Sequence, residues 1–221
     1  MEFVVFSIIC FFLLSAQIYI GTNQFKDGVA KVIGEKAFKA SYRLFYILLS
    51  LIAYIVCIKL FLQLPRVEIY NLEDSVSNLV FLIIDTIRFI ALFLIIEALW
   101  ELDLYEFLGI KQIWYFLTKK DLTIFKRNRI RDKEFIPKGL YLRHRHPVYF
   151  YMFIFFILDR SMTVSNILFI VIFTIYYNFS ARQQEARFME DYGDSYKKYQ
   201  QKVNKFLPMF KRFSAHEQPK K

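Results

Sequence analysis

The chain has 221 residues, of which 56% are hydrophobic and 19% aromatic, and it carries a formal net charge of +10. This apolar and aromatic content exceeds that of an ordinary soluble domain, and the basic residues are divided among loops rather than gathered in one patch. The composition therefore predicts an all-α integral membrane protein and argues against nucleic acid as a partner.

Five apolar segments predict about five transmembrane helices. Because a hydrocarbon core about 30 Å thick needs about 20 apolar residues per helix, three segments predict full crossings: Phe3–Ile20, Leu44–Leu62 and Leu79–Trp100. The last two, Pro147–Leu158 and Met162–Tyr177, predict a C-terminal helical hairpin. Its first arm is short for a crossing, so we expect it to start inside the interface or to lean on its neighbours.

The charges in the loops predict the orientation of these helices. The loop 21–43, the segment 111–145 and the tail after Ala181 are basic, whereas the loop 63–76 is acidic on balance. Under the positive-inside rule, this pattern predicts an outside N-terminus and an inside C-terminus. We expect the basic inner loops to contact anionic membrane lipid. Glu2 stands where a signal peptide would be basic, so we expect the first helix to be retained.

Two charged residues, Asp85 and Arg88, lie in the middle of the third apolar segment. Asp85 and Arg88 are three positions apart, so on a helix they share one face and we expect them to neutralise each other. Inside a membrane such a pair either braces the bundle or belongs to a transport pathway. The chain has no internal repeat and no Gly- or Pro-broken helix pair, which argues against a transporter. Glu97 and Glu101 are expected at the inner interface.

The chain divides near Leu102, and we expect the functional residues downstream. The three predicted parts are a three-helix membrane part, a part that carries the motifs, and a polar tail: 1–101, 102–208 and 209–221. Apolar spacing in Tyr105–Phe125 predicts an amphipathic helix at the interface. The segment Arg182–Tyr199 predicts a second surface helix, bent near Gly193.

The densest polar motif is Arg143-His144-Arg145-His146-Pro147, directly before the predicted hairpin. His-x-His suggests a metal, but zinc needs three or four protein ligands and the third histidine, His216, lies in the tail. We therefore expect no metal site. Two interpretations stay open on the residues alone: the motif binds lipid phosphate at a helix mouth, or it belongs to a functional site.

The C-terminal motifs resemble those of the isoprenylcysteine carboxyl methyltransferase superfamily. Over about 70 residues they are Gly139-Leu140-Tyr141, Arg145-His146-Pro147-Val148-Tyr149, Glu185, Tyr192-Gly193-x-x-Tyr196-x-x-Tyr199 and Phe206-Leu207-Pro208. Other segments resemble the branch that contains methanethiol S-methyltransferases and NnrU-like proteins: Gly34-Glu35-Lys36, Tyr42-Arg43-Leu44, Leu108-Gly109-Ile110-Lys111-Gln112 and Ser161-Met162-Thr163.

This resemblance implies a membrane methyltransferase that binds S-adenosylmethionine at the inner face and methylates a small or lipid-linked thiol. Arg145 and Glu185 are the implied catalytic residues. The implied cofactor-binding residues are His146, Pro147, Tyr149, Gln184, Tyr196 and Tyr199. These residue types suit the cofactor, because a guanidinium binds its carboxylate, a carboxylate binds its ammonium, and aromatic faces accept adenine or the sulfonium.

Two departures from the superfamily pattern bear on activity. Gln184-Glu185 stands where the superfamily usually has a Glu-Glu pair, and Tyr151 stands where it usually has glycine. The first change removes a charge, and the second adds a ring where a cofactor or substrate could otherwise approach the backbone. They motivate an alternative function, in which a catalytically degenerate member serves as a structural subunit of a larger membrane complex.

Overall fold

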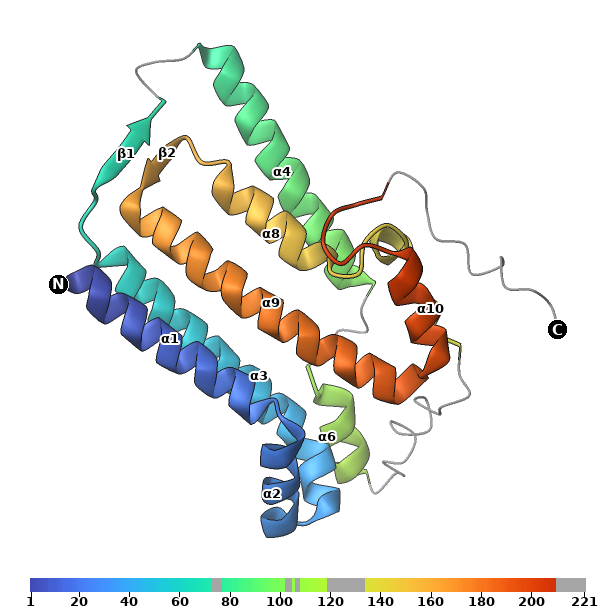
Figure 1. Ribbon diagram of the computed structural model, residues 1–221. Helices are drawn as coiled ribbons and strands as arrows, with labels where there is room; N and C mark the ends of the chain where they lie inside the picture. The colour runs from blue at the N-terminus through green and yellow to red at the C-terminus, as the bar shows by residue number, and fades with distance from the viewer. Residues whose placement is uncertain (73–76, 102–104, 106–107, 119–133, 210–221) are drawn as a thin grey trace.

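The computed structural model describes residues 1–72, 77–101, 105, 108–118 and 134–209. Within these residues, one bundle contains the apolar helices α1 (Glu2–Ile20), α3 (Glu35–Leu62), α4 (Asn78–Trp100), α8 (Pro147–Ile157) and α9 (Val164–Tyr192) (Figure 1). Four of them are long and apolar enough to cross a membrane, and α8, with 11 residues, is shorter. The prediction of an all-α, multi-pass membrane protein is therefore confirmed.

Short elements lie at the two ends of this bundle (Figure 1). At the end with the N-terminus, β1 (Glu68–Asn71) pairs antiparallel with β2 (Ser161–Thr163). The other end carries α2 (Asn23–Ile33), α6 (Ile110–Leu117), η1 (Gly139–Leu142) and α10 (Asp194–Lys202). The sequence did not predict the two strands, because segments of four and three residues are too short to show a strand alternation.

The second arm of the hairpin differs from its prediction. The apolar run suggested an end near Tyr177, but α9 continues to Tyr192. Its last turns are polar and contain good helix formers, so the helix persists beyond the apolar part. One rigid element therefore carries both a membrane-spanning face and the polar residues around Glu185.

The helix predicted over Arg182–Tyr199 is divided between two elements. Gly193 has a φ of +53°, a conformation that glycine adopts without steric cost, and it separates α9 from α10. The predicted bend is therefore a break, and α10 turns back toward the bundle (Figure 1). Of the interfacial helix predicted over Tyr105–Phe125, the structure describes α6 as a helix, and residues 106–107 and 119–125 lie outside the described residues.

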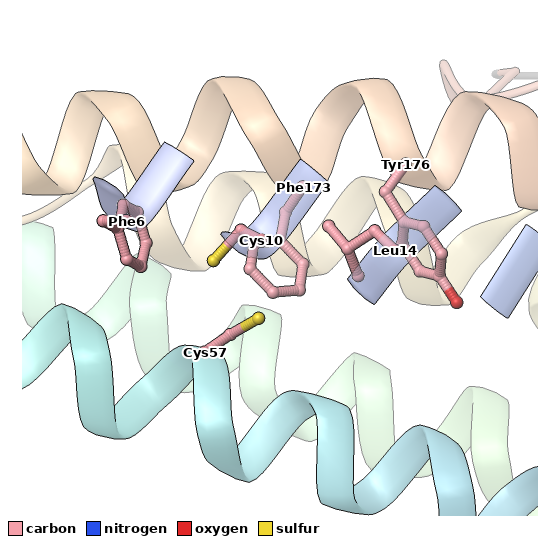
Figure 2. Close-up of a cluster of buried hydrophobic side chains, with 6 residues drawn as sticks. All are labelled: Phe6, Cys10, Leu14, Cys57, Phe173 and Tyr176. Atoms are coloured by element: carbon pink, nitrogen blue, oxygen red, sulfur yellow. The ribbon is translucent and has the colours of Figure 1, made fainter. Parts of the chain in front are cut away.

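α1, α3 and α9 share a core cluster of buried side chains, shown in Figure 2: Phe6, Cys10, Leu14, Cys57, Phe173 and Tyr176. The sulfur atoms of Cys10 and Cys57 point toward each other between α1 and α3. Phe173 stacks on Tyr54 of α3, with ring centroids 5.5 Å apart. Because lipid tails are as apolar as these side chains, close packing rather than removal from water stabilises the cluster.

Asp85 and Arg88 of α4 form ion pairs with the hairpin turn instead of with each other, so the predicted Asp85–Arg88 pairing is wrong. Arg88 Nη1 lies 3.1 Å from Asp159 Oδ1, and Asp85 forms a salt bridge with Arg160. Arg88 also lies over the Phe155 ring, 4.9 Å from its centroid. The two α4 side chains share a face, as expected, but that face meets a turn carrying one acid and one base. Both pairs therefore brace α4 against the turn that follows α8.

Phe173→Ala is expected to destabilise the bundle, because it leaves a cavity beside Tyr54. Buried Phe to Ala substitutions cost about 3–5 kcal/mol in protein cores, and we expect the thermal midpoint in detergent to fall by several degrees. Ile175→Ala is the matched control, since Ile175 is 54% exposed on the same helix and Phe173 is 3% exposed. Equal losses in the two variants would contradict the assigned core.

Candidate functional site

The residues Arg143–Pro147 form the turn that leads from η1 into α8. Pro147 starts α8, where its fixed φ and missing N–H suit the first helical turn. A C-terminal segment, residues 204–209 (the strap), runs along this turn. Its backbone hydrogen bonds, donor first, join Arg145 N to Asn204 O at 2.9 Å, His146 N to Lys205 O at 3.0 Å, and Met209 N to Arg143 O at 3.0 Å. The strap therefore fixes the backbone from which Arg145 and His146 project.

Glu185, on α9, gathers three side chains from the turn and α10. Its Oε1 lies 3.1 Å from Arg145 Nη1 and 3.0 Å from His146 Nε2. Its Oε2 accepts a hydrogen bond from Gln200 Nε2 at 3.2 Å. The side chains of Arg145 and Glu185 are 13% and 14% exposed, so the surrounding protein screens their attraction less than water would. We call these four residues the Glu185 cluster.

The charge of the Glu185 cluster depends on the protonation of His146. Burial lowers the pKa of His146 below its ordinary value, and this effect outweighs the hydrogen bond and charge of Glu185, which raise it. The imidazole is therefore neutral near pH 7 and donates its Nε2 proton to Glu185. Arg145 is then the cation that compensates the carboxylate.

A stack of aromatic rings adjoins the cluster. His146 stacks on Tyr149 with ring centroids 5.6 Å apart and planes 9° apart. Tyr149 stacks in turn on Tyr177 of α9, at 4.7 Å and 4°. Gln184 Nε2 donates a hydrogen bond to Tyr149 Oη at 2.9 Å and holds the central ring. Such a stack joins α8 to α9 and covers both faces of Tyr149, so a planar base or a cation could bind only on the outer faces of His146 and Tyr177.

Tyr196 and Tyr199, on α10, lie in an aromatic cluster that adjoins the Glu185 cluster, since the Tyr196 hydroxyl also hydrogen-bonds with Arg145. Each is 1% exposed and packs against Phe135, with ring centroids 4.9 Å away in both cases. Tyr199 Oη donates a hydrogen bond to Tyr141 O at 2.6 Å. Burial raises the pKa of both hydroxyls, so they stay protonated. The structure thus assigns these rings to the anchoring of α10, and their direct contact with a cofactor stays a prediction.

Tyr151 projects away from the face of α8 that carries Tyr149. Residues two positions apart on an α-helix point in nearly opposite directions, because the helix has 3.6 residues per turn. The Tyr151 ring packs edge-on against His144, with centroids 5.2 Å apart. His144 is buried and donates from Nδ1 to Phe206 O at 2.8 Å. The additional ring at position 151 therefore supports the strap side of the turn rather than the ring stack.

Glu101, at the C-terminal end of α4, lies directly against Gly139. Gly139 has a φ of +47°, and a β-carbon there would overlap the Glu101 carboxylate. Burial raises the pKa of Glu101, and the charge of Glu97 adds to this effect. The sequence placed Glu101 at the interface, and the structure specifies its role there: it packs between the end of α4 and η1. This close approach explains the glycine of the Gly139-Leu140-Tyr141 motif.

The sequence did not predict three residues at the site: Gln200, which belongs to the Glu185 cluster, and Asn178 and Lys205, which lie beside it. Lys205 Nζ donates a hydrogen bond to Asn178 Oδ1 at 2.9 Å. Asn178 precedes Glu185 by seven residues, two helical turns, so both project from the same face of α9. This spacing was a usable signal for Asn178. No local pattern marks Gln200 or Lys205, because the turn at Gly193 and the path of the strap bring them to the site.

The chain is similar to three curated proteins named methanethiol S-methyltransferase. It is 21% identical to the one from Crocosphaera subtropica over 142 residues, which are 64% of this chain and 51% of that relative. It is 26% identical to the Pseudomonas deceptionensis protein over 167 residues, 76% of this chain and 59% of the relative. For methanethiol S-methyltransferase 1 of Bradyrhizobium diazoefficiens, identity is 26% over 123 residues, 56% and 40% respectively.

These similarities confirm the resemblance to the methanethiol S-methyltransferase branch, at a distant level of identity. The chain spans about half the length of the curated relatives that it matches. No protein-family model and no solved structure matches it.

Gly139→Ala is expected to loosen the turn, because the new methyl group clashes with Glu101 and the residue must keep a positive φ. We expect a lower thermal midpoint in detergent, by an amount equivalent to about 1 kcal/mol or more. Gly28→Ala in α2 is the control, since a β-carbon there meets nothing within 4 Å. The control is expected to be neutral or stabilising, and a neutral Gly139→Ala variant would contradict the close approach.

Acid is expected to destabilise the protein through its buried histidines. Burial lowers the pKa of His144 as well as that of His146, whereas both are about 6.5 in an unfolded chain. The unfolded state therefore binds more protons as the pH falls below about 6.5, and stability is lost from there toward the lower folded pKa values. The thermal midpoint should fall between pH 7 and pH 5, and less so in His144→Asn. Equal slopes in both proteins would contradict this assignment.

Proposed function

We propose that the protein is a membrane-embedded, S-adenosylmethionine-dependent methyltransferase that acts on a small thiol. The observation that carries the proposal is the buried contact of Arg145 and His146 with Glu185, beside the stacked rings of Tyr149 and Tyr177. The name of the curated relatives supports the reaction class and the type of acceptor. A lipid-linked thiol, arriving from the bilayer, is the alternative acceptor.

The Glu185 cluster fits the charged groups of this cofactor. Arg145 uses Nη1 on Glu185, while its Nε is buried without a hydrogen-bond partner among the described residues. The guanidinium therefore keeps a donor for the cofactor's carboxylate. Glu185 supplies the negative charge that suits the ammonium group. Because His146 and Tyr177 cover the two faces of Tyr149, the outer faces of those two rings are the ones proposed for the adenine or the sulfonium.

The residues of the chain bind, orient and exclude water in this proposal. S-adenosylmethionine supplies, when bound, an electrophilic methyl group on a sulfonium sulfur. Arg145 and Glu185 hold the polar end of the cofactor, and neutral His146 keeps its Nε2 proton on Glu185. Gln184 fixes the Tyr149 ring through its hydroxyl. Positioning of the reactants and a dry site then provide the catalysis, because the transfer consumes charge rather than creating it.

We further propose that the Glu185 cluster faces the inner side of the membrane. The cluster includes Gln200 of α10, and α10 lies at the same end of the bundle as α2 (Figure 1). The segment 21–43, which contains α2, and the residues after Ala181 are basic. The positive-inside rule places such segments in the cytoplasmic compartment. Anionic lipid headgroups are the proposed partners of these basic segments.

Arg145→Ala is expected to abolish or strongly weaken cofactor binding. The measurement is calorimetric titration of the detergent-purified protein with S-adenosylhomocysteine, which keeps the carboxylate, the ammonium and the adenine. Loss of a charge-assisted hydrogen bond of about 1.5–3 kcal/mol predicts roughly a 10- to 100-fold higher Kd. Arg143→Ala is the matched control, because Arg143 is the exposed arginine of the same turn and its backbone contact survives the substitution.

Two results would contradict the proposal in different ways. Equal binding by wild type and Arg145→Ala would remove Arg145 from the cofactor site. Well-folded wild type that binds no S-adenosylhomocysteine would contradict the methyltransferase itself. The structural-subunit alternative then predicts partner chains that co-purify in mild detergent, in the same amounts with Arg145→Ala.

A further inference from the structure

Lys205 enters the candidate site from the strap. Its backbone carbonyl accepts the N–H of His146, and its Nζ donates to Asn178 Oδ1 at 2.9 Å. The ammonium also lies 4.9 Å from the centroid of the Phe206 ring. Backbone, amide and ring contacts together fix the position of a side chain that is otherwise among the most flexible in proteins. Such restraint is unusual for a lysine that serves only to solvate a surface.

The amine of Lys205 binds α9 at Asn178. Asn178 is two helical turns closer to the middle of α9 than Glu185 is. Lys205 of the strap thus contacts the turn through its backbone, at His146, and α9 through its side chain, at Asn178. An acceptor that comes from the bilayer reaches the level of Asn178 before it reaches the level of Glu185.

Positive charge dominates the surroundings of Lys205. The described groups that act on it electrostatically are Glu185, Arg182 and Arg145. Glu185 already compensates Arg145 at 3.1 Å, and the neighbouring His146 is neutral near pH 7. The charges of Lys205 and Arg182 therefore remain in excess around one carboxylate. A bound S-adenosylmethionine adds no net negative charge, so the excess favours an anionic second ligand.

A thiolate is the anion that the proposed reaction requires. The thiolate, not the thiol, is the nucleophile, and a nearby Lys or Arg lowers the pKa of a thiol. Burial lowers the pKa of Lys205 itself, while Glu185 raises it and the two arginines lower it. A partly desolvated ammonium attracts an anion more strongly than a fully hydrated one, because the local dielectric is lower.

We propose that Lys205 contacts the sulfur atom of the acceptor and holds it as a thiolate, so that the protein selects thiols over amines. This inference rests on the proposed methyltransferase function. The proton of the thiol passes to solvent as the acceptor binds. An electron pair of the sulfur then forms the new S–C bond, and the pair of the broken C–S bond neutralises the sulfonium. Lys205 stays protonated throughout, and Asn178 holds its Nζ in place.

Lys205→Met tests the inference, with Lys198→Met, an exposed lysine of α10, as the matched control. The first readout is kcat for methanethiol at saturating cofactor and thiol as a function of pH, because kcat reports the groups that titrate in the bound complex. We expect Lys205→Met to lower kcat at pH 7 by about 10-fold or more and to move the midpoint of its rise upward by about one pH unit. Lys205→Arg keeps the charge and should restore much of the rate.

The second readout does not depend on turnover. Methanethiol is titrated calorimetrically into protein saturated with S-adenosylhomocysteine, in two buffers of different ionisation enthalpy, at a pH below the pKa of the free thiol. Wild type and Lys198→Met should release about one proton per methanethiol bound, whereas Lys205→Met should release none or fail to bind methanethiol. Binding of S-adenosylhomocysteine should be the same in all three proteins.

The outcomes separate this inference from the function on which it rests. Wild type that transfers methyl groups while Lys205→Met keeps the same pH profile and proton release would overturn the role of Lys205 alone. Lys205→Met that loses S-adenosylhomocysteine binding as well would also overturn it, because Lys205 would then serve the cofactor or the fold. Wild type that binds no S-adenosylhomocysteine would overturn the proposed function and, with it, this inference.

Discussion

A carboxylate that leaves water must find cations and hydrogen-bond donors in the protein, and Glu185 imposes this requirement on the whole C-terminal half. Its partners come from two other segments: Arg145 and His146 from the turn before α8, and Gln200 from α10. For them to meet, α9 must run beyond its apolar part, Gly193 must break the helix, and the strap must hold the turn. The geometry of the candidate site is therefore a consequence of satisfying one buried charge.

Much of this arrangement could be predicted from the sequence, because two of its signals are local. The length of the apolar runs predicted the four long helices and the shorter α8. The motif around Arg145 and His146, taken with Glu185, predicted side chains that the structure brings within about 3 Å of one another. The choice of partner, by contrast, is a tertiary property. Asp85 and Arg88 share a face of α4 as predicted, yet the opposite charges that they meet lie on a turn more than seventy residues away.

Lys205 and Asn178 were not predicted as a pair for the same reason, because their contact depends on the tertiary structure. Neither stands in a recognisable local pattern with the other, and a hydrogen bond joins them across 27 positions of sequence. The structure also shows what the two residues that depart from the superfamily pattern contact. Gln184 holds the Tyr149 ring, and Tyr151 packs on His144 away from the ring stack. The Tyr151 ring therefore does not cover the ring stack.

The formation of dimethyl sulfide from methanethiol tests the central claim most directly. The purified protein, in lipid nanodiscs, is incubated with S-adenosylmethionine and methanethiol, and the headspace is analysed by gas chromatography. We expect dimethyl sulfide to accumulate only when protein, cofactor and thiol are all present. Folded protein that binds S-adenosylhomocysteine and yet forms no dimethyl sulfide, and no methylated product from a lipid-linked thiol, would contradict this claim.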